Sequence, residues 1–438
     1  MQQINVIGGG LAGSEAAYAI ANCGVKVKLW EMRPNNNTPV HQTSNLAELV
    51  CSNSLKSELI DTSQGLLKKE MSILGSLLLK CAESTKVPAG SALAVDRELF
   101  SKEVTKTLEA TPNIEIIRDE VTELDHNQIN LICTGPLTSK TLHESLQKLT
   151  GEENLYFFDA VAPSITAESL DKTKVFKASR YNKGTADYYN CPFTEEEYND
   201  FYQNLIKSDI KQGHSVDKKL YFSGCMPIEV IAHGGIDSLR YGPLRPVGLI
   251  DPRTGQQPYA VLQLRQEDRD GNIYGLVGFQ TRLKWGEQDK VFRLIPGLEQ
   301  AEFIRYGVMH RNTFINSPKL LLPTLQLKQN ENIFFAGQIT GVEGYMESAV
   351  TGIIAGINAV RYIKKMPLMY PNRFTMTGAL IDFITTSESK DFQPINANFG
   401  LIPPLEERIK NKKERYKQYS NRAIKATKKF SELFLSNL

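Results

Sequence analysis

A glycine-rich turn near the N-terminus has the residue types and spacing of a dinucleotide-binding motif. Gly8, Gly10 and Gly13 form a G-x-G-x-x-G pattern between a strand-like run and an Ala-rich, helix-like run. The first glycine permits a tight turn, the second lets the backbone approach a pyrophosphate, and the third allows close packing of helix and strand. Glu31 ends a second strand-like run, where a carboxylate accepts from ribose hydroxyls. The motif predicts FAD or NAD rather than NADP, because a carboxylate disfavours a 2′-phosphate.

A second glycine loop, at residues 337–344, follows the strand-like run 332–336. Residues 347–362 come next and are rich in Ser, Ala and Gly, which is typical of a closely packed helix. The N-terminus of such a helix would lie at the polar edge of a flavin ring. Two dinucleotide-type elements far apart in one chain favour FAD, which binds in an extended form. A second crossover of the NAD type is the alternative.

Six cysteines could supply a nucleophile: Cys23, Cys51, Cys81, Cys133, Cys191 and Cys225. None belongs to a C-x-x-C pair, so we expect neither a metal site nor a disulfide framework. A cysteine attacks as its thiolate, which requires nearby positive charge or a helix N-terminus. Spacing alone does not distinguish a reactive cysteine from a small packing residue.

The elements around these residues predict an α/β protein whose dinucleotide-binding domain is interrupted. Strand-like runs recur at 113–118 and 128–133, whereas residues 148–300 are rich in aromatics and turns, with a helical pattern at 195–207. We predict a FAD-binding, Rossmann-like domain of the glutathione-reductase type with an inserted α/β domain and a C-terminal basic helix. The two parts of the FAD-binding domain are expected at residues 1–147 and 301–404. The inserted domain is expected at 148–300 and the basic helix at 405–438.

Composition places the chain among globular proteins. Of its 438 residues 41% are hydrophobic and 23% are charged, both near the globular average. No run approaches the roughly 20 apolar residues of a membrane helix, and no signal peptide precedes the first strand. We therefore expect a cytoplasmic protein with no membrane partner.

The last residues combine positive charge with an apolar repeat. Residues 408–438 hold ten Lys and Arg against two Glu, a net charge of +8, although the whole chain has a net charge of only +2. Apolar residues recur every seven positions, which predicts an amphipathic helix with one packed side: Ile409, Tyr416, Ala423 and Phe430, with Tyr419, Ala426 and Leu433 at the matching positions. Its charged side would face either the phosphates of a polyanionic partner or solvent.

Longer motifs resemble the folate- and FAD-dependent tRNA (uracil-5-)-methyltransferase family, TrmFO. They are Glu31-Met32-Arg33-Pro34, AELVCSNSL at 47–55, VPAG at 87–90, AVDR at 94–97, GCMPIE at 224–229, VGFQT at 277–281, MHRNTFINSP at 309–318 and AGQITGVEGYMES at 336–348. The resemblance extends from residue 1 to about 402, so the basic tail is interpreted as an extension beyond the usual family end. The larger glucose-inhibited division protein shares the late Ala-Gly-Gln element.

The resemblance implies an enzyme that makes 5-methyluridine in RNA. The one-carbon unit would come from methylenetetrahydrofolate and be carried by reduced FAD, with NADH or NADPH as reductant and tetrahydrofolate as product. A uridine in the tRNA T-loop is the default substrate. A uridine of 23S rRNA is the alternative, since some mollicute relatives modify ribosomal RNA.

The resemblance also implies roles for particular residues. Cys225 matches the family's proposed nucleophile and Cys51 matches the second family cysteine, beside the flavin; which of them attacks the uracil stays open. Tyr345 is expected next to the flavin ring, and Glu343, Glu347 and His310 are alternatives for the base. The residues expected to bind the cofactor are Gly8, Gly9, Gly10, Leu11, Ala12, Gly13, Glu31, Met32, Arg33, Gly337, Gln338 and Gly344.

Two other classes of function stay open at this point. One is a flavin-dependent oxidoreductase acting on a small molecule, which would leave the two cysteine motifs unused. The other is a non-catalytic flavoprotein that binds RNA. The sequence does not predict an oligomeric state.

Overall fold

The N-terminal glycine motif belongs to a six-stranded sheet in a computed structural model that describes residues 3–38, 40–152, 155–182, 184–210, 226–436 and 438. The strand order is β16-β17-β7-β1-β2-β6. All neighbours pair in parallel except β16, which runs antiparallel to β17. The strands are β1 (Gln3–Ile7), β2 (Lys26–Trp30), β6 (Ile114–Ile117), β7 (Ile129–Ile132), β16 (Gln326–Leu327) and β17 (Asn330–Phe335).

Two helices that follow the glycine loops pack directly on each other. They are α1 (Leu11–Asn22) and α11 (Tyr345–Ile363). A Cβ atom on Gly352 would lie 2.1 Å from the carbonyl oxygen of Ala12, and one on Gly356 would lie 3.0 Å from the Cα of Ala16. Small residues are therefore required on α11, because they let the two helix backbones touch. This contact joins the first and the last parts of the chain.

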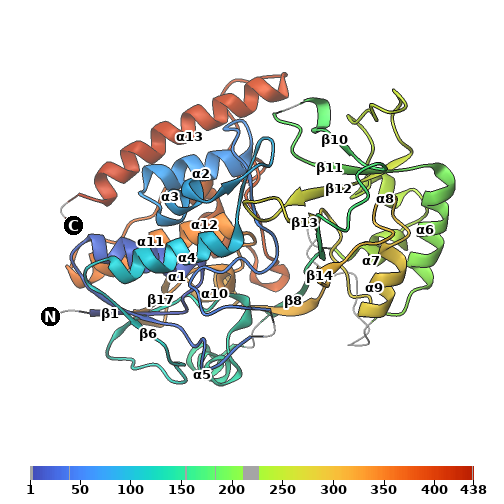
Figure 1. Cartoon of the computed structure of the whole chain (residues 1–438). Coiled ribbons are helices and arrows are strands. Elements are labelled where there is room, and N and C mark those ends of the chain that lie inside the picture. Colours follow the sequence, from blue (N-terminus) through green and yellow to red (C-terminus); the bar gives the residue numbers. More distant parts are fainter. Residues whose placement is uncertain (1–2, 39, 153–154, 183, 211–225, 437) are drawn as a thin grey trace.

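Further elements surround this sheet and form the first lobe in Figure 1. The helices are α2 (Ser63–Ile73), α3 (Leu77–Ser84), α4 (Arg97–Ala110), α5 (Lys140–Thr150), α10 (Ser317–Leu320) and α12 (Met376–Thr386). A small antiparallel sheet consists of β3 (Ser54–Ser57), β4 (Lys86–Val87) and β5 (Ala92–Val95). The short 3-10 turns η1 (Gly135–Leu137) and η5 (Gln338–Thr340) follow β7 and β17.

The second lobe contains an antiparallel sheet with the order β10-β11-β12-β13-β9-β14. Its strands are β9 (Ser164–Thr166), β10 (Phe176–Lys177), β11 (Tyr189–Phe193), β12 (Ala260–Gln266), β13 (Ile273–Leu276) and β14 (Phe303–Arg305). An aromatic core, including Phe193, Phe201 and Phe292, joins one face of this sheet to the helices α6 (Glu195–Lys207), α7 (Ile228–Ala232), α8 (Ser238–Tyr241) and α9 (Trp285–Phe292). Figure 1 shows these helices on the side away from the first lobe.

A two-stranded ribbon links the lobes. It consists of β8 (Leu155–Ala160) and β15 (Met309–Phe314), which pair antiparallel. The chain enters the second lobe along β8 and returns along β15, so both connections run side by side.

The basic tail forms the helix α13 (Lys412–Phe434), which packs on α2 along the outside of the first lobe (Figure 1). The predicted packed side is correct at Tyr419, Ala423 and Phe430 but wrong at Leu433, which is 53% exposed while Phe434 is buried. A straight helix has 3.6 residues per turn, so a seven-residue repeat drifts and the next residue takes the packed position.

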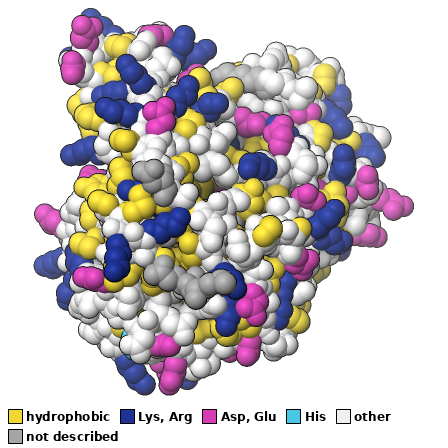
Figure 2. Space-filling model, turned by 90° about the vertical axis from the view of Figure 1, so that its left-hand side faces the viewer, with side chains coloured by type: hydrophobic (Ala, Val, Ile, Leu, Met, Phe, Trp, Pro, Cys, Tyr) yellow, Lys and Arg dark blue, Asp and Glu magenta, His cyan; other side chains and the backbone are white. Residues whose placement is uncertain are grey.

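Figure 2 shows the side of the molecule toward which both termini lie. Lys and Arg side chains are scattered there among acidic and hydrophobic ones. No helix among the described residues has the length and apolarity to cross a membrane.

Candidate active site

One cavity lies between the two glycine loops that the sequence places more than three hundred residues apart. Its lining includes most of the residues expected to bind a cofactor: Gly8, Gly9, Gly10, Leu11, Ala12, Glu31, Met32, Arg33, Gly337 and Gln338, together with Tyr345. Gly13 and Gly344 do not line it. A Cβ on Gly13 would lie 1.8 Å from the carbonyl oxygen of Gly8, so Gly13 serves the packing of the turn. Gly344 is the N-cap of α11.

The cavity receives the N-termini of α1 and α11 without side-chain caps. Within the described residues, the N-caps Gly10 and Gly344 make no capping hydrogen bond. By contrast, Thr62, Asp96 and Thr375 cap α2, α4 and α12. Uncapped first-turn N–H groups can bind an anion. A Cβ on Gly10 would meet no atom within 4 Å, so open space adjoins the turn. These features fit the pyrophosphate of FAD.

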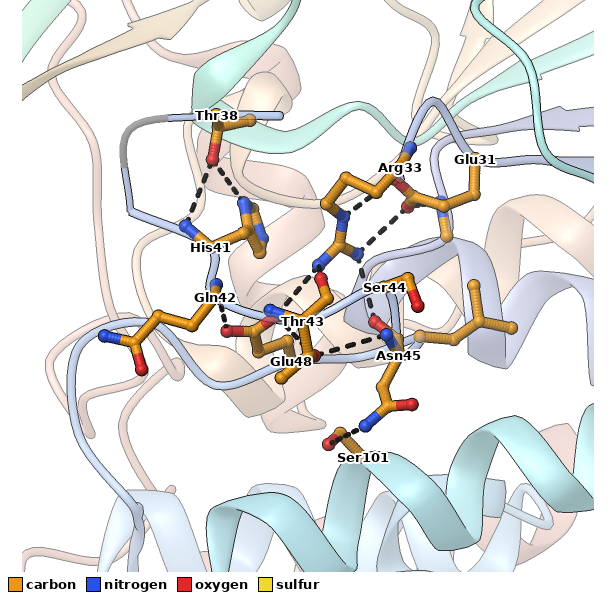
Figure 3. A network of polar contacts seen from close by, with 12 residues as sticks. Glu31, Arg33, Thr38, His41, Gln42, Thr43, Ser44, Asn45, Glu48 and Ser101 are labelled. Carbon is orange, nitrogen blue, oxygen red and sulfur yellow. Dashed lines mark hydrogen bonds and ion pairs between the residues drawn. The ribbon is translucent and has the colours of Figure 1, made fainter. Parts of the chain in front are cut away.

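Glu31 and Arg33 form a buried ion pair at the edge of this cavity (Figure 3). The Glu31 carboxylate accepts from the Gly9 N–H at 3.1 Å and from Arg33 Nε at 2.8 Å. Burial alone would raise the pKa of Glu31, but Arg33 holds it below its ordinary value. The other end of the Arg33 guanidinium donates to Glu48 and to the Thr43 carbonyl, each at 2.9 Å. Arg33 therefore fixes both Glu31 and the chain that leads toward Cys51.

Tyr345 and Cys51 lie in direct contact. The Tyr345 hydroxyl accepts from the backbone N–H groups of Cys51 and Ser52, at 2.8 and 2.9 Å. Burial first, and next the neighbouring Cys51, raise the pKa of Tyr345 far above its ordinary value, so the hydroxyl stays protonated. The Cys51 Sγ lies 4.0 Å from the carbonyl oxygen of Ala160 in β8. The half-buried thiol therefore lies where the first lobe meets the linking ribbon.

A cluster of charges from both lobes holds the Cys51 loop. Arg97, at the start of α4, donates to the carbonyl oxygens of Leu49 and Cys51, each at 3.2 Å, and to Glu267 at 2.8 Å. Glu267 follows β12 and also accepts from Arg305 at 3.2 Å. Burial alone would raise the pKa of Glu267, but Arg97, Arg305 and Arg265 hold it below its ordinary value. Glu267 is thus an ionised link between the lobes.

The second sheet also holds the residues just after Cys51. Arg265 of β12 donates to Ser52 Oγ and Asn53 Oδ1, both at 2.7 Å. The Asn53 amide donates to the carbonyl oxygens of Val95 and Gln266. Sequence reasoning singled out Arg97 through its motif but missed Arg265, Glu267 and Arg305. The only signal was charged residues at the ends of otherwise apolar strands.

Four of the five remaining cysteines lie within the described residues, and burial raises the pKa of each. Burial raises the pKa of Cys81 to about 11 and that of Cys133 and Cys191 still further, which fits their interpretation as packing residues. Burial also raises the pKa of Cys23. Cys225, expected as a nucleophile, lies outside the described residues.

Two of the candidate bases accept hydrogen bonds, and one of these bonds lies within the second glycine loop. Glu343 accepts from the Gln338 side chain at 2.5 Å, and Glu347 accepts from the Ala397 N–H at 3.0 Å. Both carboxylates are buried. The side chain of His310 is outside the described part of the structure.

Comparison with known proteins defines the class first. The family model described as Glucose inhibited division protein A matches residues 3–367. A structure of Aquifex aeolicus GidA is similar with a TM-score of 0.71 and 18% identity, over 99% of this chain and 74% of that one. The chain therefore has the GidA fold, which confirms the predicted fold class.

Closer relatives define the family within that class. A Syntrophomonas wolfei protein named Methylenetetrahydrofolate--tRNA-(uracil-5-)-methyltransferase TrmFO is 63% identical over 436 residues, which is 100% of both chains. Proteins of the same name from Pelotomaculum thermopropionicum and Enterococcus faecalis are 54% and 53% identical, over 99% and 97% of both chains. This chain belongs to the TrmFO family.

The full-length matches correct one expectation. The basic tail was interpreted as an extension beyond the family's end, yet a relative covered to 100% includes it. Its packing on α2 gives the reason, because buried aromatic residues make α13 part of the first lobe.

Proposed function

We propose that this chain is an RNA uracil C5-methyltransferase that makes 5-methyluridine in tRNA, using FAD and methylenetetrahydrofolate, with NADH or NADPH as reductant. Its family membership supports the reaction. The observation that carries the proposal is the position of Cys51, which touches Tyr345 beside the glycine-lined cavity. Arg97 of the first lobe holds its carbonyl oxygen, and Arg265 of the second lobe holds the two residues that follow it. We expect the enzyme to act in the cytoplasm, with residues 1–147 and 301–404 binding FAD and 148–300 facing RNA and folate.

The chemistry requires a nucleophile because uracil C5 is unreactive. When bound, FAD supplies a two-electron redox centre and carries the one-carbon unit. A cysteine thiolate forms a bond to uracil C6, which gives C5 enolate character. After C5 accepts the carbon, a base removes the C5 proton and the thiolate leaves C6. The two electrons that reduce methylene to methyl come from the nicotinamide. We assign the attack on C6 to Cys225 or Cys51, and the adduct experiment described below distinguishes the two.

The surrounding residues hold this machinery in place. The N-termini of α1 and α11 would hold the pyrophosphate and the polar edge of the flavin, and Glu31 the ribose. Tyr345 and Arg97 fix the main chain of Cys51 from opposite sides, through its N–H and its carbonyl oxygen. The position of the sulfur is therefore set by the fold before RNA arrives.

Label transfer tests the reaction. Purified protein is incubated with FAD, NADPH or NADH, and methylenetetrahydrofolate labelled at the methylene carbon. Unmodified tRNA and unmodified ribosomal RNA are the two acceptors. We expect label in 5-methyluridine of tRNA. Label in ribosomal RNA alone would show that ribosomal RNA, and not tRNA, is the substrate. If protein that carries FAD transfers no label, the methyltransferase proposal fails, and a small-molecule oxidoreductase or an RNA-binding flavoprotein becomes the better hypothesis.

Cysteine variants test the site. Cys51→Ala and Cys225→Ala should each lower methylation by about 100-fold or more, in the range of lost nucleophilic or acid–base catalysis. Cys23→Ala is the matched control, because Cys23 is also half-buried but lies at the end of α1 away from the glycine turn. A covalent adduct with 5-fluorouridine RNA that survives in one variant and disappears in the other identifies the sulfur that attacks C6. Full activity in both alanine variants would contradict the assigned roles.

A further inference from the structure

One face of the second sheet presents a row of polar residues to the first lobe. Gln263, Arg265 and Glu267 alternate along β12 and its end, whereas Leu262 and Leu264 point into the aromatic core. Alternate residues of a strand share a face and lie about 7 Å apart. The three side chains therefore mark a line across that face.

Each side chain of this row forms hydrogen bonds with an arginine or with the residues that follow Cys51. Gln263 accepts from Arg180 Nε at 2.9 Å. Arg265 holds Ser52 and Asn53, as described above. Glu267 accepts from Arg97 and Arg305. Three arginines, Arg97, Arg265 and Arg305, thus lie around the Glu267 carboxylate, and this surplus of positive charge beside Cys51 favours an anion.

Two arginines, Arg180 and Arg245, lie at the Gln263 end of this line. Arg245 is exposed, and Arg180 donates to the carbonyl oxygen of Val247, two residues after Arg245, so the two arginines lie close together. Burial first and Arg245 second hold the pKa of Arg180 below its ordinary value. Arg180 makes its other hydrogen bond to a neutral acceptor, the Val247 carbonyl, at 2.9 Å. Neither arginine has an ion pair among the described residues.

Tyr181 lies beside these arginines in an unusual conformation. Its side chain is 57% exposed, and its φ of 56° is in the left-handed region, which a residue with a side chain adopts at a cost. Its N–H donates to the Gly248 carbonyl at 2.8 Å, and a Cβ on Gly248 would come within 2.9 Å of its ring. The backbone thus holds a large aromatic ring at the surface.

The same loop touches the first lobe close to the site. The Asp187 carboxylate accepts from the Gly90 N–H at 2.7 Å, and Gly184 lies against the Gly90 backbone. Gly90 leads into β5, which pairs with β3 just after Cys51. Tyr181 and Arg245 therefore lie at one end of the polar face of β12, whose other end holds the residues after Cys51.

We propose that the row Arg245–Arg180–Arg265 is the path of the RNA backbone into the site, and that Tyr181 stacks on an unpaired base next to the target uridine. The proposal rests on the proposed function as an RNA methyltransferase. A uridine must leave its stack to reach the cofactor, which exposes the face of its neighbour. Aromatic rings take up such bases, and arginines bind the adjoining phosphates.

Binding of unmodified tRNA to the full-length, FAD-containing protein tests this surface. Tyr181→Leu should weaken the Kd about 5-fold to 100-fold, as expected when one stacked base is lost. Tyr181→Phe keeps the ring and should stay within about threefold. Arg245→Gln should lower the slope of log K against log salt by about 0.7 to 0.9, the share of one phosphate.

Two controls separate stacking and local charge from general effects. Lys207→Gln removes an exposed cation from α6, on the opposite side of the same sheet, and should leave the salt slope unchanged. Heparin offers anions without bases, so its binding should weaken in Arg245→Gln but not in Tyr181→Leu. FAD content and melting temperature show that each variant is folded.

The outcomes are distinct from those of the methylation assay. If wild-type protein methylates tRNA but Tyr181→Leu and Arg245→Gln bind it as wild type does, this surface is wrong and the proposed function stands. If Tyr181→Leu weakens tRNA and heparin equally, the stacking role is overturned. If wild-type protein does not methylate RNA, the proposed function fails whatever the binding results.

Discussion

The two lobes meet the site with different chemical means. The first lobe presents main chain, in the two glycine loops and the uncapped N-termini of α1 and α11. The second lobe presents side chains, in the charged row along β12. Both arrangements suit anions, but one uses N–H dipoles and the other uses whole charges. We call the glycine loops and the helix N-termini the main-chain wall of the site, and the charged row along β12 its side-chain wall. The main-chain wall requires glycine at fixed positions, whereas the side-chain wall requires only alternate residues on a strand.

This difference sets how each wall responds to change. A dipole at a buried helix end is preorganised and little affected by salt, whereas exposed arginines are screened. A substitution in the main-chain wall therefore acts through space, because any added Cβ fills the cavity or strikes the backbone. A substitution in the side-chain wall acts through charge, because a partner is left unpaired.

The largest expected effect on cofactor binding comes from the main-chain wall. Gly10→Leu should fold, since Gly10 has a φ of −74° and a Cβ there meets no atom within 4 Å. Its side chain fills the space beside the turn, so bound FAD should fall by about tenfold or more, each factor of ten being about 1.4 kcal/mol. Flavin absorbance and melting temperature of the same sample measure this.

Gly13→Ala is the matched contrast within the same turn. Its Cβ would lie 1.8 Å from the carbonyl oxygen of Gly8, so the protein itself should lose stability. If Gly10→Leu kept its FAD, or lost its fold as Gly13→Ala is expected to, the assigned roles would be wrong. These roles are space for the cofactor at Gly10 and packing of the turn at Gly13.

The next effect tests the side-chain wall. Glu267→Gln removes the one carboxylate between Arg97 and Arg305, and losing one partner of a buried pair costs about 3–5 kcal/mol. Urea unfolding measures it. Glu299→Gln breaks the exposed pair with Lys174, where solvent screens both charges, and should change stability much less than Glu267→Gln does. Equal effects of the two variants would mean that Glu267 does not join the lobes.

The same contrast explains how much of the molecule could be predicted from sequence. Gly8, Gly10 and Gly13 were recognisable because their spacing is that of a dinucleotide-binding turn, and α6 lies at the predicted range 195–207. Glu267 and Arg265 carry no such signal, since a charged residue at a strand end usually faces water. Their partners come from distant parts of the chain, and only the fold brings them together.

The contact between the walls should give an intermediate effect. Tyr345→Phe removes the acceptor of the part-buried Cys51 and Ser52 N–H groups, and each unpaired donor costs about 1–3 kcal/mol at most. Methylation should fall further than stability alone explains, because the Cys51 loop loses its position. Unfolding at saturating FAD and the rate of label transfer measure the two effects. A rate equal to that of wild type would show that Arg97 and Arg265 suffice to place the loop.

The smallest effect on the site itself is expected from changes on α13, which lies outside both walls. These changes test whether α13 is a second RNA contact beside the row along β12. Lys417, Lys425 and Lys428 are exposed, and none has an ion pair among the described residues. If they meet RNA phosphates, replacing all three by Gln should lower the salt slope of tRNA binding by about 2 to 3, which is 0.7 to 0.9 for each contact. FAD content and the effect of Tyr181→Leu should not change, since α13 packs on α2 and contributes no residue to the lining of the glycine-loop cavity. An unchanged slope would make α13 a solvated helix that stabilises the first lobe through Tyr419 and Phe430, and would leave the row along β12 as the RNA contact.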